Sequence, residues 1–227
     1  MKLAKIPKYI KHRVLLFLEK VQNKRRIPYL KKRRNILKNK DFTLISNNCN
    51  GGVLLHDLGI RFNSQFVNLF LSAEDYIKYL ERFDFYNGLK LTFVDEPSDY
   101  PIAKLEDLTV HFVHYKSNEE AESKWEERKK RINKENMFII FTEQKGCTPD
   151  LVERFDKLQF KNKVVFTYRE YKYLKSAVFV KKYKNNPLGV HMFLEFKNHF
   201  SNKRNFDVFD FVSWFNGDTD VKNLIKQ

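Results

Sequence analysis

The chain has 227 residues, of which 42% are hydrophobic and 15% aromatic, and its formal net charge at pH 7 is +15. The aromatic content excludes a chain that is disordered throughout, and the apolar runs fall far short of the ~20 residues that span a bilayer. Two cysteines exclude a disulfide scaffold, so the composition predicts a cytoplasmic globular protein.

The basic charge is concentrated at the start of the chain. Residues 1–40 contain 15 Lys and Arg residues and one acid, Glu19, whereas residues 41–227 carry 28 bases and 27 acids. The sequence therefore predicts a basic N-terminal arm over 1–40 and an α/β domain over 41–227. Apolar residues of the arm recur at helical spacing and form one stripe, which consists of Ile6, Ile10, Val14, Phe17 and Val21. We expect a basic amphipathic helix that Pro28 interrupts.

A basic helix with an apolar stripe can bind a membrane surface, the core of its own protein or a nucleic acid. Helices of this kind lie in membrane interfaces, where anionic lipid attracts the bases, so residues 1–40 predict peripheral binding to the inner face of the membrane. The stripe can instead dock on the protein's own core. Nucleic acid is the least favoured partner, because no Gly-rich or aromatic-rich RNA-binding signature accompanies the bases.

Beyond the arm, apolar runs predict strands and capping residues predict helices. The expected strands are 42–45, 65–71 (or a helical turn there), 89–95, 108–115, 137–142, 163–167 and 176–181. The expected helices are 53–58, 72–85, 117–133, 206–215 and one that begins at 148. Their predicted N-caps include Ser72, Ser117 and Thr148. Strands alternating with helices indicate a three-layer, Rossmann-like α/β fold with a mainly parallel sheet.

Ligands of open parallel sheets bind beyond the carboxyl ends of the strands. This rule selects the loops 46–52, 115–118 and 143–148, because each joins a predicted strand to a predicted helix. We expect the three loops to open on one edge of the sheet. Their candidate substrate-binding or donor-binding residues are Ser46, Asn47, Asn48, Asn50, Gly51, Gly52, Lys116, Ser117, Gln144 and Cys147.

The first loop carries the strongest chemical signal. Gly51 and Gly52 are the one adjacent glycine pair in the chain, which indicates a close backbone approach or a positive φ. Cys49 is expected near a helix N-terminus, where the dipole favours a thiolate, and His114 is the candidate base. The structural alternatives are a tight turn with a buried Cys49, a hydrogen-bonded core histidine at 114, and a purely structural Cys147, which can also approach Cys49.

Other chemistries find no support in the residues. The glycine-containing loop lacks both GxGxxG and GxxxxGK[ST], so neither NAD nor a nucleoside triphosphate is inferred. The two cysteines are 98 positions apart and no paired Cys or His spacing occurs, so no metal site is predicted. The chain also lacks the GxSxG nucleophile elbow.

Five stretches of the chain carry a family resemblance: residues 41–52 (DFTLISNNCNGG), 100–103 (YPIA), 111–117 (HFVHYKS), 125–133 (WEERKKRIN) and 146–148 (GCT). In these stretches the chain resembles a bacterial family of exopolysaccharide and capsular polysaccharide biosynthesis proteins. The Asn48-Cys49 turn is also similar to the Asn-Cys turn of a capsule-biosynthesis acetyltransferase family, in which glutamine stands at the place of Asn50.

These resemblances imply a transferase of bacterial surface-polysaccharide biosynthesis that moves an acyl group from coenzyme A to a sugar hydroxyl. The implied acceptor is a sugar or a lipid-linked sugar, and no tightly bound cofactor is expected. Cys49 would be the nucleophile or a donor contact and His114 the base. Two alternatives remain, namely a glycosyltransferase that uses a nucleotide sugar and a non-catalytic membrane-docking partner of a polysaccharide assembly complex.

Overall fold

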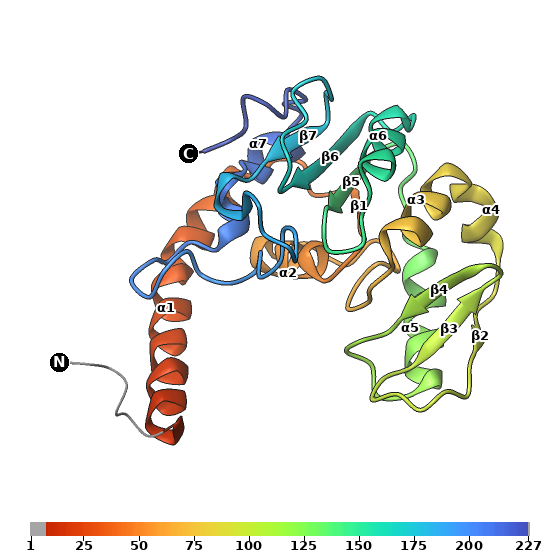
Figure 1. The fold of residues 1–227 in the computed structure, drawn as a ribbon, viewed down its shortest axis with the longest axis horizontal. Helices are drawn as coiled ribbons and strands as arrows, with labels where there is room; N and C mark the ends of the chain where they lie inside the picture. Colours follow the sequence, from red (N-terminus) through yellow and green to blue (C-terminus); the bar gives the residue numbers. More distant parts are fainter. Residues whose placement is uncertain (1–7, 227) are drawn as a thin grey trace.

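The computed structural model describes residues 8–226, so residues 1–7 of the predicted arm, including Ile6, lie outside the described residues. Within this range the chain forms an α/β fold with a four-stranded parallel sheet, in the order β1-β5-β6-β7 (Figure 1). The parallel strands are β1 (Thr43–Ser46), β5 (Met137–Thr142), β6 (Asn162–Thr167) and β7 (Ala177–Phe179). A separate antiparallel sheet contains β2 (Thr92–Phe93), β3 (Ile102–Leu105) and β4 (Leu108–His111).

Helices cover both faces of the parallel sheet. The helices of the described chain are α1 (Lys8–Ile36), α2 (Asn50–Leu58), α3 (Ala73–Glu81), α4 (Phe83–Gly88), α5 (Asn118–Lys129), α6 (Pro149–Lys157) and α7 (Phe211–Phe215), with 3-10 turns at Lys181–Tyr183 and Asn205–Val208. Of these, α3 and α6 lie over one face of the parallel sheet, and α2 and α7 lie over the other. The predicted N-caps are confirmed, since the side chains of Ser72, Ser117 and Thr148 each accept a hydrogen bond from the backbone N–H three residues on. No helix among residues 8–226 combines the length and the apolarity that crossing a bilayer requires.

The side chains of β5 alternate between two hydrophobic cores. Ile139 and Phe141 face the core that α3 and α6 cover, whereas Phe138 and Ile140 face the core that α2 and α7 cover. A strand buried on both faces consists of a continuous apolar run, as β5 does. Trp125 of α5 joins the first core, and Figure 1 shows α5 lying with β2, β3 and β4 at the end of the molecule away from α1.

The predicted parallel strand at 108–115 is wrong. β4 ends at His111 and pairs antiparallel with β3, which has no counterpart among the predicted strands. The two strands form a hairpin whose turn places Glu106 in the left-handed region, at φ 59°. Hydrogen bonding within this local hairpin replaces the predicted pairing with the distant parallel strands. The loop 115–118 therefore does not follow a strand of the parallel sheet.

Two further segments differ from their predicted structure. Residues 65–71 are mostly buried but irregular, and they pair through a single bridge between Phe70 and His111. Their apolar character therefore reflects packing in the core rather than a strand. The predicted helix 206–215 is divided into a 3-10 turn and α7, because the Asp210 side chain caps α7 and starts a new helix there.

α1 continues through Pro28, which was predicted to interrupt it. A proline inside a helix removes one backbone hydrogen bond and costs about 3 kcal/mol. Tertiary contacts on both sides of Pro28 offset this cost. Arg26 forms buried ion pairs with Asp57 and Asp207, at 2.8 Å and 2.6 Å, and the Tyr29 hydroxyl donates a hydrogen bond to Asp207.

Candidate functional site

The loops that follow β1 and β5 leave the parallel sheet toward opposite faces. β1 leads into α2, whose Leu54 packs in one core, and β5 leads into α6, whose Phe155 packs in the other. β1 and β5 are neighbours in the sheet, and ligands of open α/β folds bind where the loops of two neighbouring strands diverge in this way. We refer to residues 46–50 and 142–147 as the β1–β5 edge.

Asn47 ties the two halves of the β1–β5 edge together. Its side chain is buried, its Oδ1 accepts a hydrogen bond from the Thr142 N–H at 3.1 Å, and its Nδ2 donates to the Thr142 carbonyl. Its own carbonyl accepts from the Leu71 N–H at 3.0 Å. Asn47 thus joins the end of β1 to the end of β5 and to Leu71, which is a structural role beneath the edge.

The next amides are half-buried and lie nearer the surface of the β1–β5 edge. Asn48 Oδ1 accepts hydrogen bonds from the Asn50 N–H at 3.0 Å and from the buried Ser46 hydroxyl, and Asn48 Nδ2 approaches Gln144 Oε1 at 3.5 Å. Asn50 Nδ2 donates to the Thr142 hydroxyl at 3.2 Å. The structure thus brings together the predicted residues of the first and third loops, as amide groups that can both donate and accept hydrogen bonds.

The glycine pair is explained by close backbone approach. A Cβ atom at Gly51 would lie 2.8 Å from Ser46 Cβ, and one at Gly52 would lie 3.3 Å from Val67 Cγ1. Neither glycine is among those with positive φ. The absence of side chains lets the first turn of α2 lie directly against the end of β1 and against the irregular segment 65–71.

Cys49 occupies the N-cap position of α2 but provides no side-chain cap. Its Sγ is half-buried and lies 4.0 Å from the carbonyl of Leu69, rather than beside a histidine ring. Burial raises the pKa of the Cys49 thiol, which is opposite to the direction expected from the helix dipole. The geometry therefore favours a neutral Cys49 thiol, which can contact a ligand. It does not favour an activated nucleophile.

This protonation state predicts the pH profile of Cys49 alkylation. In the folded Cys147→Ser variant, we expect the rate of reaction with iodoacetamide to keep rising above about pH 8.5, where a free thiol levels off. The raised pKa keeps the reactive thiolate scarce until higher pH. Mass spectrometry of quenched samples measures the rate, and the urea-unfolded variant is the control. A rate that levels off below about pH 7 would instead identify an activated nucleophile.

Within residues 8–226, the candidate residues of the second predicted loop form no hydrogen bond with the β1–β5 edge. His114 is exposed in the turn after β4, Lys116 is exposed, and the Ser117 hydroxyl caps α5 by accepting from the Glu120 N–H at 3.2 Å. The predicted approach of His114 to the parallel sheet fails because β4 belongs to the antiparallel sheet. Tyr115 is the residue of this loop that points inward, since its hydroxyl donates to a backbone carbonyl at residue 67.

A buried carboxylate that the sequence analysis missed organises the far side of the β1–β5 edge. Glu143 is fully buried and accepts hydrogen bonds from Arg169 Nε at 2.6 Å, from the Tyr171 hydroxyl at 2.8 Å and from two backbone N–H groups. Arg169 also donates to the Cys147 carbonyl at 2.7 Å. The sequence shows only an acid directly after a buried strand. The role of Glu143 is not visible in the sequence, because its partners Arg169 and Tyr171 lie more than 20 residues away.

The surroundings of Cys147 favour a purely structural role over a role in substrate binding. Both cysteines are free, and Cys147 is buried with its Sγ 3.5 Å from the Thr148 carbonyl. Burial, with a further contribution from the Glu143 charge, raises the pKa of the Cys147 thiol to about 12. A thiol with this pKa is protonated at physiological pH and is a poor nucleophile. Among residues 8–226, no group of three or more His, Cys, Asp or Glu side chains is placed to hold a metal ion.

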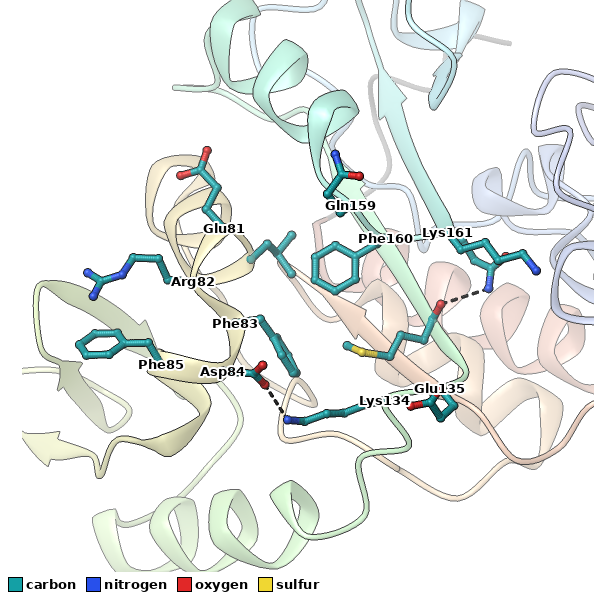
Figure 2. Close-up of a pocket in the computed structure, with 13 residues that line it drawn as sticks. Glu81, Arg82, Phe83, Asp84, Phe85, Lys134, Glu135, Gln159, Phe160 and Lys161 are labelled. Carbon is teal, nitrogen blue, oxygen red and sulfur yellow. Dashed lines mark hydrogen bonds and ion pairs between the residues drawn. The ribbon is translucent and has the colours of Figure 1, made fainter.

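A pocket of about 700 Å³ lies at the opposite edge of the sheet, where β5 and β6 begin (Figure 2). Phe83 and Phe160 meet edge to face in it, with ring centroids 6.1 Å apart. Lys134 pairs with Asp84 at 2.6 Å. The lining of this pocket contains none of the predicted site residues, so it is separate from the β1–β5 edge.

Two comparisons with known proteins bear on the chain. A family model described as a domain of unknown function, DUF1919, matches residues 20–216. An uncharacterized protein of Haemophilus influenzae is 45% identical over 181 residues, which cover 79% of this chain and 86% of that protein. The matched range of the family model begins within α1 and ends just after α7, so it includes the parallel sheet and the β1–β5 edge.

Proposed function

The chain belongs to the DUF1919 family, and from the geometry of the β1–β5 edge we propose that it is a transferase of bacterial surface-polysaccharide biosynthesis. It moves an acyl group from coenzyme A to a hydroxyl of a sugar or lipid-linked sugar. The hydroxyl oxygen forms a bond with the thioester carbonyl carbon, the carbon–sulfur bond breaks, and coenzyme A leaves as the thiol with the hydroxyl proton.

The arrangement of the parallel sheet supports a donor site at the β1–β5 edge. We infer a Rossmann-like arrangement, because β1, β5 and β6 are parallel neighbours and α2 and α6 cover opposite faces of the sheet. In folds of this kind, phosphate-bearing coenzymes and nucleotides bind beyond the carboxyl ends of the strands.

The start of α2 is the observation that carries the proposal. The Cys49 side chain does not cap this helix, and Asn48 Oδ1 accepts the N–H of its first residue, Asn50. The amides of Asn48, Asn50 and Gln144 lie around this first turn. The N-terminus of a helix attracts phosphate through its backbone N–H groups and its dipole. Coenzyme A carries a diphosphate that this end of α2 would bind. Cys49 would contact this acyl donor. His114 has no part in this scheme, because it lies outside the β1–β5 edge.

The substitution Asn48→Asp tests donor binding. An aspartate at this position still accepts the hydrogen bond from the Asn50 N–H, and its charge is favourable at a helix N-terminus, so the melting temperature is expected to stay the same or rise. The same charge repels a diphosphate. We therefore expect coenzyme A and acetyl-coenzyme A to raise the melting temperature of the unmodified protein but not that of the variant.

The matched control is Asn198→Asp. Asn198 Oδ1 also accepts a hydrogen bond from the backbone N–H two residues later in the chain, that of Phe200, at 3.0 Å. Asn198 lies beside α1, away from the start of α2. This variant should respond to coenzyme A as the unmodified protein does. A panel of nucleotide sugars in the same experiment separates the alternatives: stabilisation by a nucleotide sugar alone would identify a glycosyltransferase. Two results would contradict an acyl-donor site at the start of α2. In one, neither coenzyme A nor any nucleotide sugar raises the melting temperature; in the other, coenzyme A raises the melting temperatures of Asn48→Asp and of the unmodified protein equally.

A further inference from the structure

α1 consists of two halves with different surroundings. Its C-terminal half is held on the body by the buried ion pairs of Arg26 and by Gln22, whose Nε2 donates to the carbonyls of Asn198 and Ser201. Its N-terminal half, residues 8–21, extends away from the body (Figure 1). The body therefore holds α1 by one end and presents the other end to its surroundings.

The projecting half carries large apolar side chains that nothing in the described structure covers. Four of them form the stripe predicted from the sequence, with exposed fractions of 47% for Ile10, 50% for Val14, 66% for Phe17 and 37% for Val21. At about 100° per residue, Phe17 and Val21 lie roughly 100–140° around the helix from Gln22, which faces the body. The alternative that the stripe docks on the protein's own core is wrong for these residues.

The charges of the arm are arranged around the stripe. At helical spacing, Arg13, Lys20 and Lys24 lie along one side of it and Arg25 along the other. The one acid of residues 1–40, Glu19, instead lines a hollow between α1 and the body together with Gln22 and Arg204. The outward surface of α1 thus combines apolar side chains with bases, and its acid is turned toward the body.

From this arrangement we propose that the N-terminal half of α1 is an interfacial helix that binds an anionic lipid bilayer. The stripe enters the boundary between headgroups and acyl chains, and the flanking bases contact anionic headgroups. Electrostatic attraction alone would suit any polyanion, but a nucleic acid would leave the apolar stripe in water. The combination of both features selects the membrane surface, and this inference does not depend on the proposed transfer reaction.

Vesicle co-sedimentation of the full chain tests the inference. We expect binding to vesicles of phosphatidylcholine and phosphatidylglycerol, little binding to phosphatidylcholine alone, and weaker binding as salt increases. The double variant Val14→Asp and Phe17→Asp should lose about tenfold or more in affinity, because two carboxylates replace apolar contacts at an anionic surface. Its melting temperature should not change, since both side chains are exposed and distant from Arg26.

The matched control places the same two charges on the body. Leu188→Asp and Met192→Asp change side chains that are 46% and 57% exposed, and this variant should bind vesicles as the unmodified protein does. Equal binding of the stripe variant and this control, or binding that ignores phosphatidylglycerol, would overturn the inference. Sedimentation equilibrium without lipid tests whether the stripe forms a dimer interface. A dimer that the stripe substitutions dissociate would also overturn the inference, because the stripe would then pack against a second copy of the chain. Binding of an RNA oligonucleotide without vesicle binding would also overturn it.

Discussion

The substitution Arg26→Met is expected to destabilise the native protein by about 3–5 kcal/mol, because it removes the guanidinium that pairs with both buried carboxylates, Asp57 and Asp207. Arg26 donates to Asp57 through Nε and Nη2 and to Asp207 through Nη1, and the three side chains are almost fully buried. Methionine fills a similar volume, so the loss measures the missing guanidinium charge rather than a cavity. Urea unfolding followed by far-UV circular dichroism gives the free energy of unfolding.

A triple variant separates the charge effect from other effects of the substitution. Adding Asp57→Asn and Asp207→Asn to Arg26→Met removes the two buried negative charges that lost the Arg26 guanidinium, and we expect it to recover a substantial part of the lost stability. If Arg26→Met unfolded at the same urea concentration as the unmodified protein, the ion pairs would not be what fixes α1 to the body.

The second large effect is expected at Glu143. Replacing it by alanine removes the acceptor of the Tyr171 hydroxyl, of Arg169 Nε and of two backbone N–H groups, so buried donors lose their hydrogen bonds. We expect a loss of about 2–4 kcal/mol in the free energy of unfolding, measured in urea. The segment 168–171 should also detach from the β1–β5 edge, and deuterium exchange at its backbone amides would increase.

Glu143→Gln is the control for this prediction. Glutamine has nearly the same shape and keeps one oxygen as an acceptor for the backbone N–H groups, but it loses the charge that pairs with Arg169. Its loss of stability should therefore be clearly smaller than that of Glu143→Ala. Unchanged amide exchange over 168–171 in Glu143→Ala would show that Glu143 does not hold this segment.

The candidate site could be predicted in part. The sequence predicts the loops 46–52 and 143–148 on one edge, because each joins a strand to a helix, and the structure brings them together. The same rule predicts the loop 115–118 on this edge, but that loop follows an antiparallel hairpin. The rule fails here because nothing in residues 108–115 distinguishes a parallel strand from one arm of a hairpin. The role of Glu143 cannot be predicted from the sequence, because a single acid after a strand does not reveal its distant partners Arg169 and Tyr171.

Features that depend on neighbouring residues could be predicted from the amino-acid sequence. A Ser or Thr hydroxyl caps the N–H three positions on, and this contact forms wherever the helix lies, so the starts of α3, α5 and α6 could be predicted. The buried strand β5 was predicted with its observed ends for a similar reason, because its apolar run is short and uninterrupted.

Features that depend on distant residues could not be predicted, because they arise from contacts that form when the chain folds. Arg26 meets Asp207 across 181 positions, and such contacts hold α1 helical through Pro28. Burial beneath other segments sets the direction of the Cys49 pKa shift, which its place at a helix start predicted wrongly. The stripe of α1 has the same helical period whether it packs on a core or faces outward, because periodicity defines a face of a helix but not what covers that face.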